Sequence, residues 1–235
     1  MVNAQMVHII MPAKDSLDTA EQAIRAIVAS GHTLTVYDDY STEENAKRLD
    51  ALQRELGIRV VHICEHVNHP SPNYRWVLIA AQHEALKREQ DLVIVESDVI
   101  VRPDTIDKLI VESQKPNVGM VAAVTVDEKG AVNFPYEYAK KIHEDGSCTK
   151  RFSFCCTLLT KTFLKTYDFE QLNPEKNWYD VHISHESVKR GFVNILQVSN
   201  PVLHKPHSSR PWKQLKYTNP LLYYWRKLTQ GRDKI

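Results

Sequence analysis

Two carboxylates separated by one residue, Glu96 and Asp98, directly follow a wholly apolar run, Leu92–Val95. The run predicts a buried strand, and residues two apart in an extended chain project to the same side. Hard oxygen ligands in that position suit Mg²⁺ or Mn²⁺ holding a diphosphate. Because acidic residues also end strands as solvated turns, this pattern alone leaves both interpretations open.

Further carboxylates follow the other predicted strands of the first half. Asp15 comes after the first strand, and Asp38 and Asp39 come after the second. In open α/β sheets, ligands bind at the edge where the carboxyl ends of parallel strands meet. We therefore expect these side chains to share one ligand-binding edge with Glu96 and Asp98.

The elements that position these residues alternate between strand and helix through the first half. Ser41–Glu44 has the pattern of a capping box and starts a helix that ends at Gly57. The alternation predicts an α/β fold with a doubly wound, Rossmann-like, mostly parallel sheet and right-handed crossovers. The expected strands are 7–12, 34–37, 59–64 and 92–95, and the expected helices are 20–28, 41–56, 76–86 and 103–109.

The second half is less regular. Its apolar patterns predict strands at 118–126, 152–159 and 192–198 and a helix at 178–190. The segment after His204 is rich in Pro and Ser, which predicts a mobile loop before an aromatic and basic tail. Cys155 and Cys156 lie inside a predicted apolar strand, so we interpret them as small core residues.

Charge is distributed unevenly along the chain. The 235 residues include 30 Lys and Arg and 29 Asp and Glu, for a net charge of +1. Residues 205–235 carry +7 and residues 1–204 carry −6. The acidic body has no electrostatic footprint for nucleic acid, so we expect no nucleic-acid partner.

Other sequence features limit the protein class and setting. We expect neither a signal peptide nor a membrane span, and four cysteines without a CxxC pattern favour a reducing, cytoplasmic setting. With seven glycines and no GxGxxG, GxxxxGK[ST] or GxSxG motif, a dinucleotide dehydrogenase, a P-loop enzyme and an α/β hydrolase are disfavoured.

At three points the first half resembles the nucleotide-binding part of family 2 glycosyltransferases with a GT-A fold. Ile9–Asp15 resembles the opening strand of that family, Val36–Glu43 its DDGSTD segment, and Glu96–Asp98 its DxD metal motif. Tyr40 replaces the usual Gly of the second motif, and Glu96 replaces the usual Asp of the third.

The second half resembles the same family at two points. Trp178–Asp180, with Gly191 and Phe192 downstream, resembles the segment that carries the catalytic acid. Asn200–His204 resembles the strand that ends in a metal-binding histidine. The resemblance covers residues 6–206. It implies one GT-A domain, with a nucleotide-binding half at about 1–115, a smaller acceptor-binding half at about 116–206, and a tail at 207–235 outside it.

Carried over to this sequence, the resemblance implies that Asp39 accepts a hydrogen bond from the base and that Asp15 lines the same pocket. Asp98 would bind the metal directly, and His204 would be a further ligand that tilts the choice toward Mn²⁺ over Mg²⁺. Glu96 is one methylene longer than Asp and could reach the metal through water or contact the ribose of the donor instead.

The resemblance also implies an inverting transfer with Asp180 as the general base that takes the proton of the acceptor hydroxyl. An exposed acid in the first turn of a helix is the alternative for Asp180 alone. Arg75, Lys205 and Arg210 are candidates for pairing with the diphosphate, although each could be a solvated cation.

The resulting hypothesis is a metal-dependent inverting hexosyltransferase that moves a sugar from a nucleotide donor, preferentially a UDP-sugar, to a glycan or lipid-linked acceptor, as in polysaccharide biosynthesis. The alternatives are a catalytically silent nucleotide-sugar binding or scaffold subunit and a sugar-phosphate nucleotidyltransferase. The tail predicts either peripheral contact with the inner face of the cell membrane or packing on protein, including a homodimer.

Overall fold

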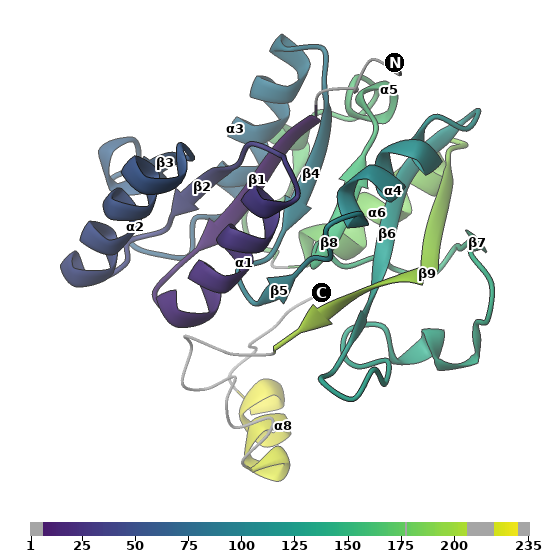
Figure 1. Ribbon diagram of the computed structural model, residues 1–235. Coiled ribbons are helices and arrows are strands. Elements are labelled where there is room, and N and C mark those ends of the chain that lie inside the picture. The colour runs from purple at the N-terminus through teal and green to yellow at the C-terminus, as the bar shows by residue number, and fades with distance from the viewer. Residues whose placement is uncertain (1–6, 177, 206–218, 230–235) are drawn as a thin grey trace.

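The computed structural model describes residues 7–176, 178–205 and 219–229. Its first half confirms the predicted alternation, with every strand pair parallel in the order β3-β2-β1-β4 (Figure 1). The strands are β1 (Val7–Ala13), β2 (Thr35–Asp38), β3 (Arg59–His62) and β4 (Asp91–Val95). The helices between them are α1 (Leu17–Ala29), α2 (Glu43–Leu56) and α3 (Tyr74–Lys87), and β3 runs into the 3₁₀ turn η1 (Ile63–Glu65).

Helices cover both faces of the sheet, which is the doubly wound arrangement that the sequence predicts. Alternate residues of β1 enter different cores: Ile9 and Met11 belong to the core that includes residues of α1, α2 and α4 (Thr105–Ser113), whereas Ile10 belongs to the core that includes residues of α3 and α6 (Tyr179–Lys189). Because both faces of the sheet are covered at its centre, β1 and β4 are predominantly apolar.

The second half makes the sheet mixed. β8 (Cys156–Leu159) lies between β4 and β6 (Val118–Val126) and is antiparallel to both. β9 (Val193–His204) runs parallel to β6 and pairs with the short strands β5 (Val99–Ile100) and β7 (Gly146–Ser147). The remaining elements are η2 (Glu137–Lys141), α5 (Lys161–Leu164), η3 (Phe169–Gln171) and α8 (Pro220–Thr229).

Several sequence predictions need correction in detail; the strand expected at 59–64, for example, ends at His62. The strand expected from Phe152 begins only at Cys156, and the strand expected at 192–198 continues to His204 as one element. The predicted capping box is wrong in detail, because Thr42 is the N-cap of α2. The Ser41 hydroxyl instead accepts a hydrogen bond from the backbone N–H of Asp15, at 2.8 Å, which ties the loop after β1 to the loop after β2.

Candidate active site

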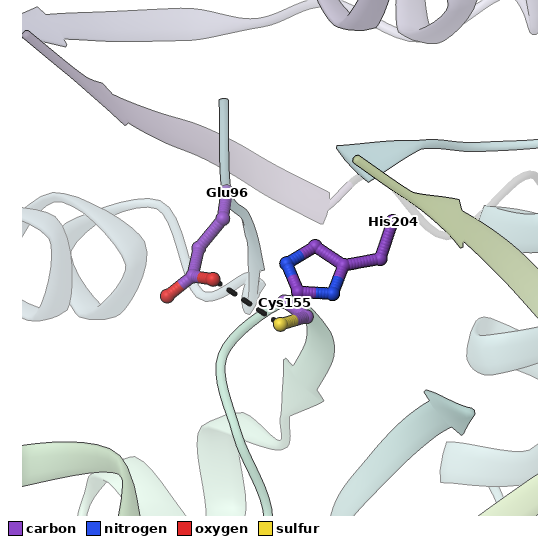
Figure 2. A group of neighbouring side chains, drawn as sticks. All are labelled: Glu96, Cys155 and His204. Atoms are coloured by element: carbon purple, nitrogen blue, oxygen red, sulfur yellow. Dashed lines mark hydrogen bonds between the residues drawn. The ribbon is translucent and has the colours of Figure 1, made fainter. Parts of the chain in front are cut away.

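Three strand ends meet where the sequence predicts a ligand-binding edge. Val95 of β4 pairs with Cys156 of β8, and the Glu96 N–H continues this ladder by donating to the Cys155 carbonyl at 3.0 Å. Val99 of β5 pairs with His204 at the end of β9. Backbone pairing therefore brings Glu96, Cys155 and His204 together from distant parts of the chain (Figure 2).

Their side chains point toward one another. The Cys155 thiol donates to Oε2 of Glu96 at 3.1 Å, and one ligand atom from each of Glu96, Cys155 and His204 lies within 4.8 Å of the others (Figure 2). Asp98 also contacts this group, with Oδ2 3.5 Å from Nε2 of His204. The structure thus brings together the predicted metal ligands Asp98 and His204 with Glu96.

The pKa values in this cluster are shifted because its carboxyl groups lie close together and are partly buried. Burial and the neighbouring charge of Asp98 raise the pKa of Glu96 to about 7. For His204, burial lowers the pKa, but the nearby Asp98 and Glu96 carboxyls outweigh it and leave the pKa raised. The site is therefore short of positive charge, which a divalent cation would supply.

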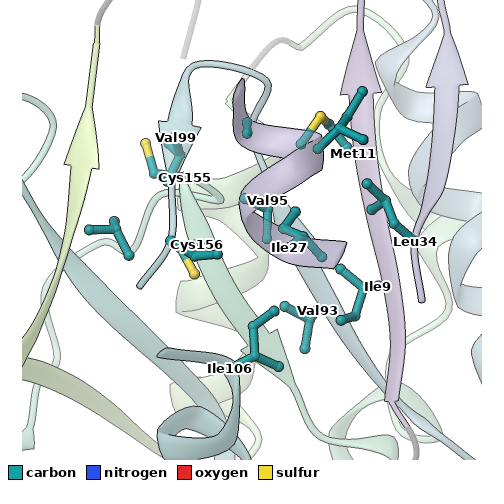
Figure 3. Packing of buried hydrophobic residues seen from close by; sticks show 14 of the residues in the cluster. Ile9, Met11, Ile27, Leu34, Val93, Val95, Val99, Ile106, Cys155 and Cys156 are labelled. Carbon is teal, nitrogen blue, oxygen red and sulfur yellow. The ribbon is translucent and has the colours of Figure 1, made fainter. Parts of the chain in front are cut away.

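Cys155 is the member of the cluster that the sequence interpretation misses. Cys155 and Cys156 are both buried in the core on the α1 face, which confirms their assignment as core residues (Figure 3). The Cys155 thiol nevertheless also contacts Glu96. Burial and the charge of Glu96 raise its pKa well above the ordinary value. No local motif marks this residue, because its contact depends on the pairing of β8 with β4.

Asp180 lies in the first turn of α6, partly buried, and accepts a hydrogen bond from the backbone N–H of Val181 at 2.8 Å. Burial raises the pKa of Asp180 to about 6. Burial raises the pKa values of Glu96 and Tyr74, and the charge of Asp180 adds a smaller increase to both. Within the described residues the buried Tyr74 hydroxyl has no hydrogen-bond partner.

Asp15 and Asp39 both organise the loops at the carboxyl edge. Oδ1 of Asp15 accepts from the Thr42 N–H at 2.9 Å and the Asn45 side-chain amide at 3.0 Å. Although burial raises the pKa of Asp15, these hydrogen bonds leave it lowered overall. Both Asp15 and the next residue, Ser16, have positive φ angles, 51° and 52°, a local strain of the kind found at functional sites.

Asp39 binds the loop before α3. Its carboxylate accepts from the Ser71 hydroxyl at 2.7 Å and from the backbone and side-chain amides of Asn73 at 2.9 and 2.7 Å. Tyr40, which replaces the glycine of the resembled motif, has a φ of 63°, in the left-handed region that glycine favours. Its hydroxyl donates to the carbonyl of Val67.

The predicted cations are placed as follows. Arg75 donates from Nε to the Leu172 carbonyl at 2.7 Å and from Nη2 to the Glu170 carbonyl, so its guanidinium supports η3 in this structure. Lys205 lies beside the site, its N–H donating to the Asp98 carbonyl at 2.9 Å. Arg210 lies outside the described residues. Pairing of these cations with a diphosphate remains a prediction.

The donor atoms present fit a divalent cation. Carboxylate, imidazole and thiol groups converge, and the imidazole is oriented by a hydrogen bond from Nδ1 to the Phe134 carbonyl at 2.7 Å. A carbonyl oxygen can only accept, so Nδ1 carries a proton and Nε2 is the nitrogen that faces the cluster. Orientation of a histidine ligand by a backbone carbonyl is common in metal sites.

Comparison with known proteins identifies the fold. The chain is similar in structure to GalNAc-T7, which was crystallised with UDP, GalNAc and Mn²⁺. The match covers 89% of this chain and 45% of the GalNAc-T7 chain, with a TM-score of 0.62 and 12% sequence identity. The match with residues 1–349 of S. aureus TarS covers 95% of this chain and 66% of the TarS chain, with a TM-score of 0.60 and 13% sequence identity. No protein-family model and no curated protein sequence matches it.

The fold is therefore that of the GT-A glycosyltransferases, as the sequence predicts. The chain spans less than half of the GalNAc-T7 structure. At these identities the likeness defines the fold, and the chemistry must come from the site itself.

Proposed function

We propose that this protein is a metal-dependent, inverting glycosyltransferase of the family 2 type that uses a nucleotide-sugar donor, preferentially a UDP-sugar. One observation carries the proposal: Glu96, Asp98 and His204 converge at the carboxyl edge of a GT-A sheet. UDP, GalNAc and Mn²⁺ bound to the structural neighbour GalNAc-T7 support a nucleotide-sugar donor and a divalent metal.

In this proposal Asp180 is the general base. Its raised pKa of about 6 still leaves it ionised at neutral pH, while making it a stronger base than a solvated carboxylate. It takes the proton from the acceptor hydroxyl as that oxygen attacks the anomeric carbon. Asp15 and Asp39 would shape the pocket for the nucleoside through the loops that they hold. A divalent cation, when bound, would neutralise the diphosphate leaving group.

The test is transfer and donor hydrolysis by Asp180→Asn. We expect the variant to bind UDP-sugars as the wild type does and to lose transfer by a factor on the order of 10² or more. Normal transfer by Asp180→Asn would show that another group is the base. Donor binding by the wild type without any UDP release would favour the silent binding subunit instead.

The acceptor side of the proposal involves helix α8. Its exposed apolar residues, Leu221, Tyr224, Trp225 and Leu228, have the i, i+3, i+4, i+7 spacing of one helical face. The adjacent Arg226 and Lys227, within residues 205–235, which carry +7, would complement an anionic surface. Within the described residues, no helix is long and apolar enough to cross a bilayer. We therefore propose that α8 lies on an anionic membrane surface, where lipid-linked acceptors occur.

Vesicle sedimentation tests this assignment. Wild-type protein should pellet with vesicles that contain anionic phospholipid, and Trp225→Glu should remain in solution. Val111→Glu is the matched control, because Val111 is a similarly exposed apolar residue on α4. Equal recovery of wild type and Trp225→Glu in the pellet, or a wild-type dimer that Trp225→Glu dissociates without any vesicle binding, would overturn the membrane assignment.

A further inference from the structure

The thiol of Cys155 is an unusual neighbour for a proposed magnesium or manganese site. Mg²⁺ and Mn²⁺ prefer oxygen ligands, whereas thiolate sulfur favours softer cations such as Zn²⁺. Cys155 nevertheless directs its Sγ at Oε2 of Glu96, 3.1 Å away, beside the imidazole of His204 (Figure 2). A cysteine that only filled the core would need no contact with a carboxyl group.

We propose that Cys155 is a sulfur ligand of this metal site, so that the chain binds a borderline-soft divalent cation, Zn²⁺ or Co²⁺, in preference to Mg²⁺. This inference deepens the metal part of the proposed function and rests on it. When the sulfur–metal bond forms, the thiol S–H bond breaks and its proton passes to solvent. No oxidant or reductant is needed.

The separations between donor atoms suit such a site. Zinc–sulfur and zinc–nitrogen bonds of ordinary length place the ligand atoms of a tetrahedral site about 3.3–3.8 Å apart. The donor atoms of Glu96, Cys155 and His204 all lie within 4.8 Å of one another, so small side-chain adjustments would complete the geometry. The carboxyl group of Asp98 lies next to His204, with Oδ2 3.5 Å from Nε2, and would be the fourth ligand.

The backbone makes this arrangement rigid. Glu96 and Cys155 are held by the ladder between β4 and β8, and His204 is held by its pairing with Val99. Metal ligands placed on paired strands keep their relative positions without a bound metal, which favours a stable selectivity for one class of cation.

Cobalt spectroscopy tests the proposal directly. Titration of metal-free protein with Co²⁺ should produce a near-ultraviolet sulfur-to-cobalt charge-transfer band in the wild type and none in Cys155→Ser. Cys64→Ser is the matched control, because Cys64 is exposed and lies outside the cluster. Cys155→Ser should also weaken Zn²⁺ binding by at least about tenfold, because even residues that only support metal ligands have effects of this size. The affinity for Mg²⁺ should stay unchanged.

A band retained in Cys155→Ser, or Co²⁺ binding by the wild type without any such band, would overturn the proposal. The wild-type measurement decides even where the Cys155→Ser variant folds poorly. The two proposals also fail separately. A charge-transfer band in a protein that never binds or cleaves a nucleotide-sugar would support the sulfur ligand and reject the glycosyltransferase proposal. Transfer activity without the band would support the glycosyltransferase proposal and reject the sulfur ligand.

Discussion

Nδ1 of His204 lies 2.7 Å from the carbonyl oxygen of Phe134, which fixes the imidazole so that Nε2 faces Asp98, at 3.5 Å, and the neighbouring thiol of Cys155. The end of β9 therefore presents Nε2 to the site, and the Nδ1 contact that orients the ring involves no other catalytic candidate. Histidines held in this way are oriented before the metal arrives.

Replacing this imidazole should weaken metal binding. His204→Ala is expected to reduce the affinity for Mn²⁺ or Zn²⁺ by at least about tenfold, measured by calorimetry on metal-free protein. His185→Ala, on the exposed face of α6, is the control and should bind metal as the wild type does. Equal affinities for the two variants would remove His204 from the ligand set.

Glu96→Gln should stabilise the metal-free protein. The pKa of Glu96 is raised from 4.5 to about 7, so the native state binds this proton more tightly than the unfolded state, and stability is lost as the pH rises between these values. We expect the variant to have a free energy of unfolding higher by about 1–3 kcal/mol at about pH 8, with no gain below about pH 4.5.

Denaturant melts at the two pH values measure this effect, with the exposed Glu44→Gln as control. A loss of stability in Glu96→Gln at the higher pH would contradict the pKa shift. Metal binding should weaken in the same variant, since a carboxylate ligand is lost.

Transfer should fall as the pH is lowered through about 6. Burial raises the pKa of Asp180 to about 6, and only the ionised carboxylate can accept the proton of the acceptor hydroxyl. The rate is to be measured at saturating donor, with donor binding followed in parallel. A rate that stays constant down to about pH 5, well below this pKa, would assign the base to another group.

Tyr74→Phe removes a hydroxyl that is buried beside the acidic cluster without a hydrogen-bond partner among the described residues. The free energy of unfolding should stay the same or rise by up to about 1 kcal/mol. If the hydroxyl serves a ligand, the Kd of the nucleotide-sugar should rise about 3–10-fold. Tyr136→Phe is the contrast, because the Tyr136 hydroxyl bonds both the N–H and the carbonyl of Ser153 and its loss should destabilise the protein. An equal loss of stability in both variants would refute the unpartnered state of Tyr74.

Asp39→Ala should destabilise the loop before α3. The substitution leaves the Ser71 hydroxyl and both amides of Asn73 without their acceptor, a cost of about 2–3 kcal/mol. Ser71→Ala removes one of these donors and should cost about 1 kcal/mol. Equal losses in thermal or denaturant melts would show that the carboxylate does not hold the loop.

The local sequence pattern predicts most of the fold of the first half and the edge at which the candidate site lies. β1 and β4 are compact, largely apolar runs, and the carboxylates that follow the parallel strands of the first half must meet at one edge. The positions of Asp15, Asp39, Glu96 and Asp98 follow from that rule. The fold class follows from the alternation of strand and helix, and the comparisons with GT-A structures confirm it.

The features that the sequence does not predict depend on contacts between distant residues. Cys155 contacts Glu96 across 59 residues because β8 inserts antiparallel beside β4, and no periodicity in either segment signals that pairing. Ser71 and Asn73 reach Asp39 in the same way, across 32 and 34 residues. Arg75 is a candidate phosphate ligand by sequence, but in the structure it donates to the carbonyls of Glu170 in η3 and of Leu172 just after it, nearly 100 residues away.

β9 ends at His204, and α8 begins at Pro220 on the same chain. The sixteen peptide units between these residues cannot extend beyond about 55 Å. If α8 rests on a bilayer, as proposed, the active site can be no farther from the lipid headgroups than the length of this spacer plus the width of the domain. The reacting hydroxyl of an acceptor must lie within the same distance. In the proposed function, this tether would exclude acceptor hydroxyls that lie farther from the membrane than that distance, so that the spacer and not the active site would set the upper limit on product length.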